Sequence, residues 1–181
     1  MMRTQLDTIE SSAGTFQMAL AAEQDVDLVR QLLTEAAEWM KSRGIRQWNP
    51  DQFTEDEIRK YFATRDIFLM LDGTEPAGMF TLQSSDPDYW GTLNDARFNY
   101  LHRLTVRPSY RRHSLGREMI YWAARHSRKA GRKGLRFDCW SENHKLNPYY
   151  AELGMEKRGI GELNGRQYIL YEMNAGLYQK L

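Results

Sequence analysis

The sequence predicts a single α/β domain with a mixed central sheet of about seven strands, flanked by about four helices. Three observations support this class. Short apolar and β-branched runs alternate with longer segments whose apolar residues recur at helical spacing. A strand, a helix and another strand follow one another over 99–140, the order of a parallel, right-handed βαβ unit. A length of 181 residues suits one domain, so we expect 1–181 to form it, with a core over about 16–173.

The first third of the chain is predicted to contain one strand and two helices. FQMALA, residues 16–21, has the composition of a strand. A helix should follow between Asp25, a favoured N-cap residue, and Gly44, which ends it. Thr54 stands three residues before Glu57, as in a capping box, and predicts a short second helix.

The rest of the chain is predicted to supply most of the sheet. Gly-, Pro- and Asn-containing turns separate its apolar runs. The expected elements are, in order, a hairpin of strands 67–72 and 77–84, a long loop over 85–98, a strand over 99–107, a helix from 115 to about 130, a strand over 135–140, a helix over 146–153, and strands over 155–159 and 167–173.

Composition indicates a globular protein without a membrane segment. Hydrophobic residues make up 41% of the chain and aromatic residues 12%, which excludes a disordered class. No apolar run approaches the ~20 residues of a bilayer span, and the start lacks the apolar stretch of a secretory signal. One cysteine, Cys139, is too few for a disulfide framework or a thiolate zinc site. We therefore expect a cytoplasmic protein with no membrane partner and no metal.

Charge is segregated along the chain, although the net charge is only +1. Residues 101–136 carry eleven Lys and Arg against one acid, whereas residues 1–100 carry nine basic and seventeen acidic side chains. The basic segment is a candidate anion site, and the acidic half would attract a cation. Nucleic acid is a less favoured partner, because the basic segment contains no recognised nucleic-acid motif.

Two motifs carry a family resemblance. VRP over 106–108 ends a predicted strand, and RRHSLG over 111–116 enters a predicted helix. Downstream, a second pattern consists of Asn143, Leu146, Tyr149, Tyr150 and Gly154. In this order and on these elements, the motifs resemble the GNAT superfamily of acyl-CoA-dependent N-acyltransferases. GIRQW and YLHRLTV are also similar to segments of a bacterial branch of that superfamily. The resemblance covers roughly 16–173 and implies a GNAT-like fold, splayed between the fourth and fifth predicted strands.

The resemblance implies acetyl-CoA (coenzyme A) as co-substrate. A helix N-terminus attracts a diphosphate, because its first N–H groups point outward and the helix dipole is positive there. Ser114 stands where the family pattern has glycine, and serine is disfavoured if that position needs a positive φ. For Asn143 a plain helix N-cap is the alternative role. The implied cofactor contacts are Leu104, Thr105, Val106, Arg111, Arg112, His113, Ser114, Leu115, Gly116, Arg117 and Asn143.

The implied reaction is direct attack of an amine on the thioester, without a protein nucleophile. Cys139 then reads as a small buried apolar residue. Tyr150 occupies the family position of the acid that protonates the leaving thiolate, while its neighbour Tyr149 reads as a packing residue. His102 is a candidate general base, because its intrinsic pKa lies near neutrality. A structural role for His102 is the alternative, and Asp138 could hold a water molecule.

The acceptor is expected to be an amine, either a small molecule or a peptide. The acidic first half and the DPDYW segment would favour a cationic amine. A non-catalytic acyl-CoA-binding module is the alternative function, and the sequence leaves a homodimer open. The candidate acceptor contacts are Trp48, Asp86, Asp88, Tyr89, Trp90 and Tyr100.

Overall fold

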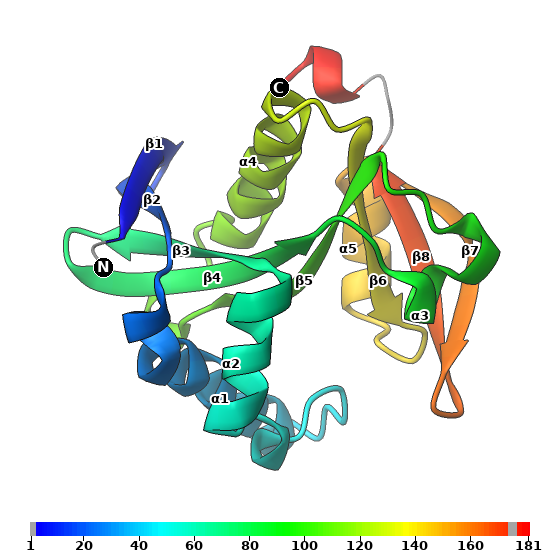
Figure 1. Cartoon of the computed structure of the whole chain (residues 1–181), viewed down its shortest axis with the longest axis horizontal. Helices are drawn as coiled ribbons and strands as arrows, with labels where there is room; N and C mark the ends of the chain where they lie inside the picture. Colours follow the sequence, from blue (N-terminus) through cyan, green and yellow to red (C-terminus); the bar gives the residue numbers. More distant parts are fainter. Residues whose placement is uncertain (1–2, 174–176) are drawn as a thin grey trace. The chain divides into compact units, whose positions relative to one another are not determined.

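The computed structural model describes residues 3–173 and 177–181 and has the predicted α/β architecture. Its sheet contains eight strands in the order β1-β2-β3-β4-β5-β6-β8-β7 (Figure 1). Contacts group the described residues into two compact units, one of residues 3–82 and 103–119 and the other of 83–102, 120–173 and 177–181. In the described part of the chain, no helix is both long and apolar enough to cross a membrane.

Unit one is built on an antiparallel set of strands. β1 (Thr4–Ser11) pairs with β2 (Gly14–Leu20), β2 with β3 (Asp66–Asp72), and β3 with β4 (Glu75–Gln83). The sequence prediction of seven strands missed β1. This strand has a single buried residue, Ile9, so it lacks the apolar alternation by which strands are recognised.

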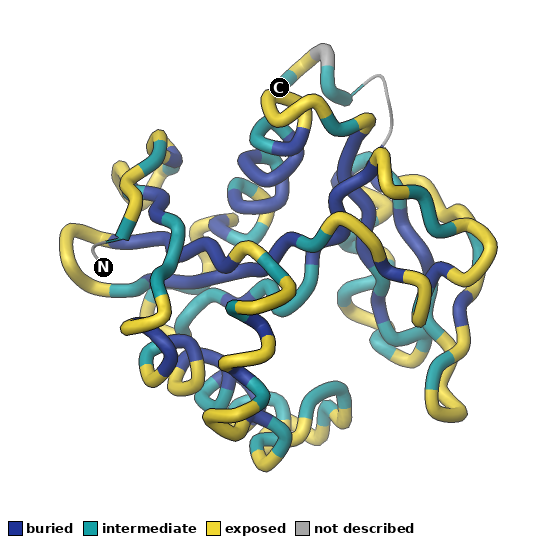
Figure 2. The backbone as a smooth tube through the Cα atoms, viewed as in Figure 1, coloured by how far each residue is buried: buried dark blue, intermediate teal, exposed yellow. Residues whose placement is uncertain are grey.

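Two helices pack on the sheet of unit one, α1 (Val26–Ser42) and α2 (Glu55–Thr64) (Figure 1). Thr54 caps α2 as predicted, since its hydroxyl accepts from the Glu57 N–H at 3.3 Å. Asp25 does occupy the N-cap position of α1, but its carboxylate binds Arg3 at 2.7 Å and the Ala22 N–H instead of the helix. Figure 2 shows β3 and β4 buried along most of their length. The core therefore lies between this sheet and the apolar face of α1.

Unit two contains the closing hairpin and most of the βαβ return, whose segment 103–119 belongs to unit one. β5 (Phe98–Val106) pairs in parallel with β6 (Gly134–Trp140) over Phe98–Leu101 and Gly134–Phe137, only the first part of each strand. β8 (Arg166–Met173) then pairs antiparallel with β6 and with β7 (Met155–Leu163), which is longer than predicted. α4 (Leu115–Lys129) and α5 (Leu146–Glu152) match the predicted helices. The predicted long loop contains the short helix α3 (Pro87–Trp90).

A buried arginine anchors unit two. The Arg136 guanidinium donates to Glu172 and to the Leu93 carbonyl, both at 2.8 Å, and to the Tyr100 hydroxyl at 3.2 Å. It also lies 3.7 Å from the centroid of the Phe98 ring. A buried charge is tolerated only when it is paired and hydrogen-bonded, and Arg136 meets both conditions. It thereby ties β6 to β8 and to the loop that follows α3.

Candidate functional site

The turn between β5 and α4 is anchored to unit one by polar contacts on both sides. The Arg107 guanidinium binds the Glu35 carboxylate of α1 through two contacts of 3.0 Å. The Tyr110 hydroxyl donates to Asp72 at 3.1 Å, and its ring packs edge-on against Phe16 at 5.9 Å. Both contacts precede the RRHSLG segment, so they fix where it begins.

Backbone geometry makes the RRHSLG segment a tight, exposed turn. Arg112 and Ser114 have φ angles of +73° and +56°, in the left-handed region. His113 lies between them, and all three residues are exposed. Ser114 therefore does occupy a conformation that favours glycine, and this is the strained case anticipated from the sequence.

The turn ends at the first turn of α4. Leu115 is buried and fixes the helix on the core, while Arg117 is exposed and contacts Glu118 at 3.0 Å. The Glu118 N–H donates to the Ser114 carbonyl at 3.1 Å, which places the amides of 115–117 in the first helical turn. Amides at this position have no acceptor within the helix. They are therefore available donors at the positive end of the helix dipole.

Arg111 lies against α1 in this structure. Its guanidinium lies 3.8 Å from the centroid of the Trp39 ring, and its Nε donates to the Val106 carbonyl at 3.1 Å. Burial, with a contribution from Arg43, lowers the pKa of Arg111 from its usual value. Leu104 and Val106 are half-buried on β5, and Thr105 is buried.

Tyr150 lies in an aromatic cluster of unit two. Its ring centroid is 4.6 Å from that of Phe137, 5.7 Å from that of Tyr171 and 5.8 Å from that of Tyr149. Burial raises the pKa of Tyr150, so its hydroxyl keeps its proton at neutral pH. Tyr150 is therefore packed among aromatic rings, and its protonated hydroxyl can donate a hydrogen bond.

Asn143 and Asn147 shape the start of α5. The Asn143 side-chain oxygen accepts from the N–H of Leu146, the first residue of α5, at 3.0 Å, a local contact that resembles the cap predicted as the alternative role, although Lys145 occupies the N-cap position. The Asn147 amide donates to the Trp140 and Asn143 carbonyls, both at 3.0 Å, and accepts from the Tyr171 hydroxyl at 2.9 Å. Sequence reasoning missed Asn147, whose partners come from three different segments.

Cys139 has the environment of a structural residue. It is buried in β6, and burial, with a smaller effect of Asp138, raises the pKa of its thiol to about 12. A thiol nucleophile reacts as the thiolate. At neutral pH Cys139 therefore has little nucleophilic character.

His102 lies between two carboxylates of unit two. Its Nε2 is 2.8 Å from Asp86 Oδ2, and its Nδ1 is 3.6 Å from Asp138 Oδ2. All three side chains are at most 14% exposed. Each could offer a ligand atom to a cation, and these atoms lie within 4.8 Å of one another. However, 2.8 Å is a hydrogen-bond length, whereas two tetrahedral ligands of one zinc ion lie roughly 3.3 Å apart. The geometry is that of a hydrogen-bonded imidazole.

Asp86 is held in place by the segment around α3. Its N–H donates to the Asn94 side chain at 2.8 Å, and its carbonyl accepts from the Trp90 N–H at 3.0 Å. The Tyr89 ring lies 5.6 Å from the His102 ring, between centroids, and 4.9 Å from that of Tyr168. A Cβ added to Gly161 of β7 would collide with the Tyr89 carbonyl, so α3 and β7 touch through backbone. Asp86 therefore has little freedom to move away from His102.

Other acceptor candidates have structural roles. Tyr100 is fully buried, and its hydroxyl binds the Asp95 backbone and Arg136. Trp90 is 2% exposed and packs on Tyr100 at 5.5 Å, whereas Asp88 is exposed. We therefore leave Tyr100 and Trp90 out of the acceptor site.

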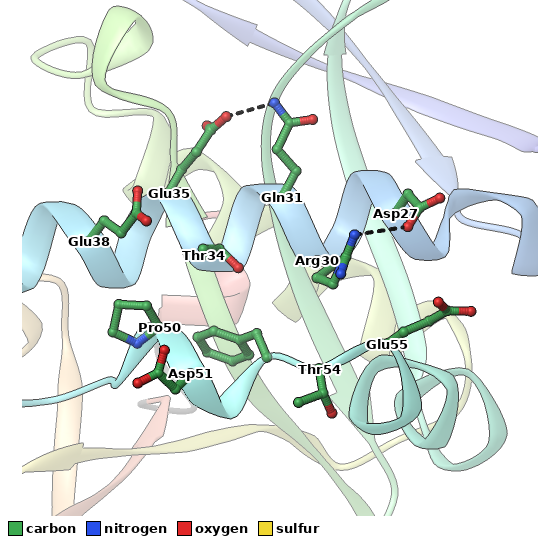
Figure 3. Close-up of a pocket in the computed structure, with 11 residues that line it drawn as sticks. Asp27, Arg30, Gln31, Thr34, Glu35, Glu38, Pro50, Asp51, Thr54 and Glu55 are labelled. Atoms are coloured by element: carbon green, nitrogen blue, oxygen red, sulfur yellow. Dashed lines mark hydrogen bonds and ion pairs between the residues drawn. The ribbon is translucent and has the colours of Figure 1, made fainter.

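Unit one has an acidic groove between α1 and residues 50–55. Its volume is about 750 Å³. Figure 3 shows Thr34 and Arg30 on the side of α1 that faces residues 50–55, whereas Gln31 and Glu35 point away from them. Three of its carboxylates pair with arginines: Asp27, Glu35 and Glu55. The remaining carboxylates of the lining are Glu38 and Asp51.

Trp48 is one of three aromatic residues that surround the side chain of Arg103 on β5. The Arg103 guanidinium lies 5.3 Å from the ring centroids of both Trp48 and Phe53, and its Nε donates to the Tyr61 hydroxyl at 3.1 Å. Arg103 itself has a φ of +57° within β5, which interrupts the regular alternation of the strand directly after His102. Sequence reasoning missed Arg103, because its contacts lie more than 40 residues away.

Comparison with known proteins identifies relatives. The family model described as the acetyltransferase (GNAT) family matches residues 46–155. The uncharacterized N-acetyltransferase YesJ of Bacillus subtilis (strain 168) is 26% identical over 156 residues, which is 83% of this chain and 87% of YesJ. The crystal structure of a GNAT-family acetyltransferase from Listeria monocytogenes 4b F2365 superposes with a TM-score of 0.74 at 25% identity, covering 92% of this chain and all of that one. AAC(6')-Ib, in complex with ribostamycin and coenzyme A, shares the fold at 12% identity, with a TM-score of 0.71 over 90% of this chain and 95% of its own.

Proposed function

Because this chain belongs to the acetyltransferase (GNAT) family, we propose that it transfers the acetyl group of acetyl-CoA directly to an amine. The observation that carries the proposal is the turn between β5 and α4. Two left-handed residues, Arg112 and Ser114, bring a basic segment onto the first turn of a 15-residue helix. A diphosphate fits such a group of amide donors.

In this proposal unit one binds the nucleotide end of the coenzyme. The amides of 115–117 hold the diphosphate, and Arg112 and Arg117, both exposed, supply charge to the phosphates. Arg111 is already ordered on Trp39, so it would have to leave that ring to contact a phosphate directly. AAC(6')-Ib, which shares the fold, has been crystallised with coenzyme A.

Direct transfer suits the chemistry of the available side chains. The amine nitrogen attacks the thioester carbon, the C–S bond breaks, and the amine loses a proton. The raised pKa of the Cys139 thiol argues against an acetyl-cysteine intermediate. Tyr150, kept protonated by burial, would donate a hydrogen bond to the leaving thiolate.

A cationic amine is the acceptor class that we favour. Asp86 and Asp138 lie in unit two, and Glu38 and Asp51 line the groove of unit one. Carboxylates at two candidate sites would attract a protonated amine and raise its local concentration.

Isothermal titration calorimetry with coenzyme A, and a thiol-release assay with acetyl-CoA and a panel of amines, test the proposal. We expect coenzyme binding and an acetylated amine detected by mass spectrometry. Arg112→Gln should weaken coenzyme binding by about 10-fold or more, because it removes a charge-assisted contact. Arg125→Gln, on α4 beyond the turn, is the matched control and should bind normally. Coenzyme binding without turnover of any amine would favour the non-catalytic module, and absence of binding would refute the proposal.

A further inference from the structure

Distances around His102 distinguish its two ring nitrogens. Nε2 lies 2.8 Å from Asp86 Oδ2, a charge-assisted hydrogen bond. Nδ1 lies 3.6 Å from Asp138 Oδ2, longer than a hydrogen bond. The two carboxylates therefore act on the imidazole from different directions, through different atoms.

The short contact selects one tautomer of the neutral ring. A carboxylate only accepts hydrogen bonds, so Nε2 must carry the hydrogen that faces Asp86. In the neutral imidazole the other nitrogen, Nδ1, then has the basic lone pair. Nδ1 and Asp138 Oδ2 thus form two neighbouring acceptors, a pair that fits a group with two N–H donors.

We propose that His102 Nδ1 is the base that takes the proton of the acceptor ammonium, with Asp86 as the positioning residue that fixes its tautomer. This inference rests on the proposed function. The ammonium donates one N–H to Nδ1 and another to Asp138. The N–H bond to Nδ1 then breaks, the nitrogen keeps the electron pair for attack on the thioester, and a new Nδ1–H bond forms. The imidazolium lies between two carboxylates until it releases the proton to solvent.

The charged and titratable groups around the ring agree with this role. Asp86 approaches from the residue before α3, Asp138 from β6, and the Tyr89 ring from α3 itself. Both charged neighbours are carboxylates, so each can accept a hydrogen bond from the imidazolium that forms when His102 takes the proton. The contacts of Asp86 with Asn94 and Trp90 limit its movement, so the ring stays oriented through the cycle.

Two classes of amine separate a base from a structural histidine. An aliphatic amine has a pKa of about 10 and is protonated at pH 7, whereas an aryl amine or a hydrazide is already neutral. In the full-length protein, His102→Gln should lower kcat/KM for the aliphatic amine by roughly 100-fold to 10,000-fold, the usual contribution of a general base. The same variant should change kcat/KM for the neutral amines much less.

Asp86→Asn tests the positioning role. The Asn amide can donate to Nε2, which would move the hydrogen to Nδ1 and remove the basic lone pair while keeping the packing. We expect a loss of kcat/KM close to that of His102→Gln for the aliphatic amine, and a much smaller loss for the neutral amines. Glu162→Gln, an exposed carboxylate of β7 outside the candidate site, is the matched control and should resemble the wild type.

Asp138→Asn tests whether Asp138 binds the acceptor ammonium, as distinct from the orientation of the His102 ring by Asp86. It leaves the Asp86–His102 contact in place, so KM for the aliphatic amine should rise more than kcat falls. Melting temperatures of all variants show whether each one folds.

The outcomes separate the two proposals. If the wild type turns over aliphatic amines and His102→Gln and Asp86→Asn do so at the same rate, the role of His102 as a base is refuted. The proposed transferase function is not affected by that result. Equal losses on protonated and neutral amines would also refute it, because the defect would then be structural. Activity that disappears on dialysis against EDTA and returns with Zn²⁺ or Mn²⁺, only when Asp86 is present, would make the cluster a metal site instead. No turnover by the wild type with any amine would refute the proposed function itself.

Discussion

Replacing Ser114 with glycine should stabilise the protein, because Ser114 has a φ of +56°. A left-handed conformation costs an L-residue about 1–2 kcal/mol. The unfolded chain of the glycine variant has a greater conformational entropy, which offsets about 0.5–1 kcal/mol of this gain in stability. The free energy of unfolding should therefore rise by about 0.5–1 kcal/mol, and the melting temperature by roughly 1–4 °C for a chain of this size.

Gly131→Ala is the matched control for this change. Gly131 follows α4 with a φ of +79°, and no atom lies within 4 Å of an added Cβ, so the substitution tests backbone conformation alone. It should lower the free energy of unfolding by about the amount that Ser114→Gly raises it. Urea denaturation followed by circular dichroism measures both. If both Ser114→Gly and Gly131→Ala lower the free energy of unfolding, the prediction is wrong. The Ser114 side chain would then stabilise the fold by more than its left-handed backbone destabilises it.

Three further predictions concern the turn, the buried arginine and the thiol. Gly116→Ala adds a Cβ that has no atom of the chain within 4 Å, so the free energy of unfolding should not fall. The affinity for coenzyme A, measured by calorimetry, should fall at least about 10-fold, because the Cβ keeps the phosphates away from the helix backbone. An unchanged affinity would contradict the proposed cradle. Arg136→Met removes the closer of the two basic partners of partly buried Glu172 and should cost about 1–3 kcal/mol in urea denaturation; a loss under about 1 kcal/mol would refute the anchoring role. For Cys139 the unfolded thiol releases its proton near pH 9 and the folded one near pH 12. The folded state binds more protons in that window, so stability should fall as pH rises, by about 1.4 kcal/mol per unit relative to Cys139→Ala. Parallel pH curves for the two proteins would show that the thiol is not buried as described.

Periodicity in the sequence predicted the elements that bury a regular face. α1 and α4 were recognised because apolar residues recur along one side of each helix. β1 was missed because an edge strand with one buried residue gives no such pattern. α3 is only four residues long, so it falls below the length at which helical spacing can be read.

The candidate site was predictable where it depends on local sequence. The RRHSLG turn and its position before a helix follow from residues that are adjacent in the chain. The partners of His102 do not, because Asp86 lies 16 residues earlier and Asp138 lies on another strand. Such contacts arise from tertiary packing, and residue types alone leave many pairings open. The sequence likewise does not determine the backbone angles of Arg112 and Ser114, which are left-handed in the structure.

Through the backbone contact between Gly161 and the Tyr89 carbonyl, β7 would affect the reaction proposed at His102, although it contributes no side chain to that site. Any larger residue at Gly161 must displace Tyr89 of α3, and the Asp86 carboxylate before this helix would move with it. A shift of about 1 Å at a reacting group can cost roughly 100-fold in rate. Substitutions at Gly161, on the edge strand β7, should therefore change the proposed turnover even though this residue has no polar side chain.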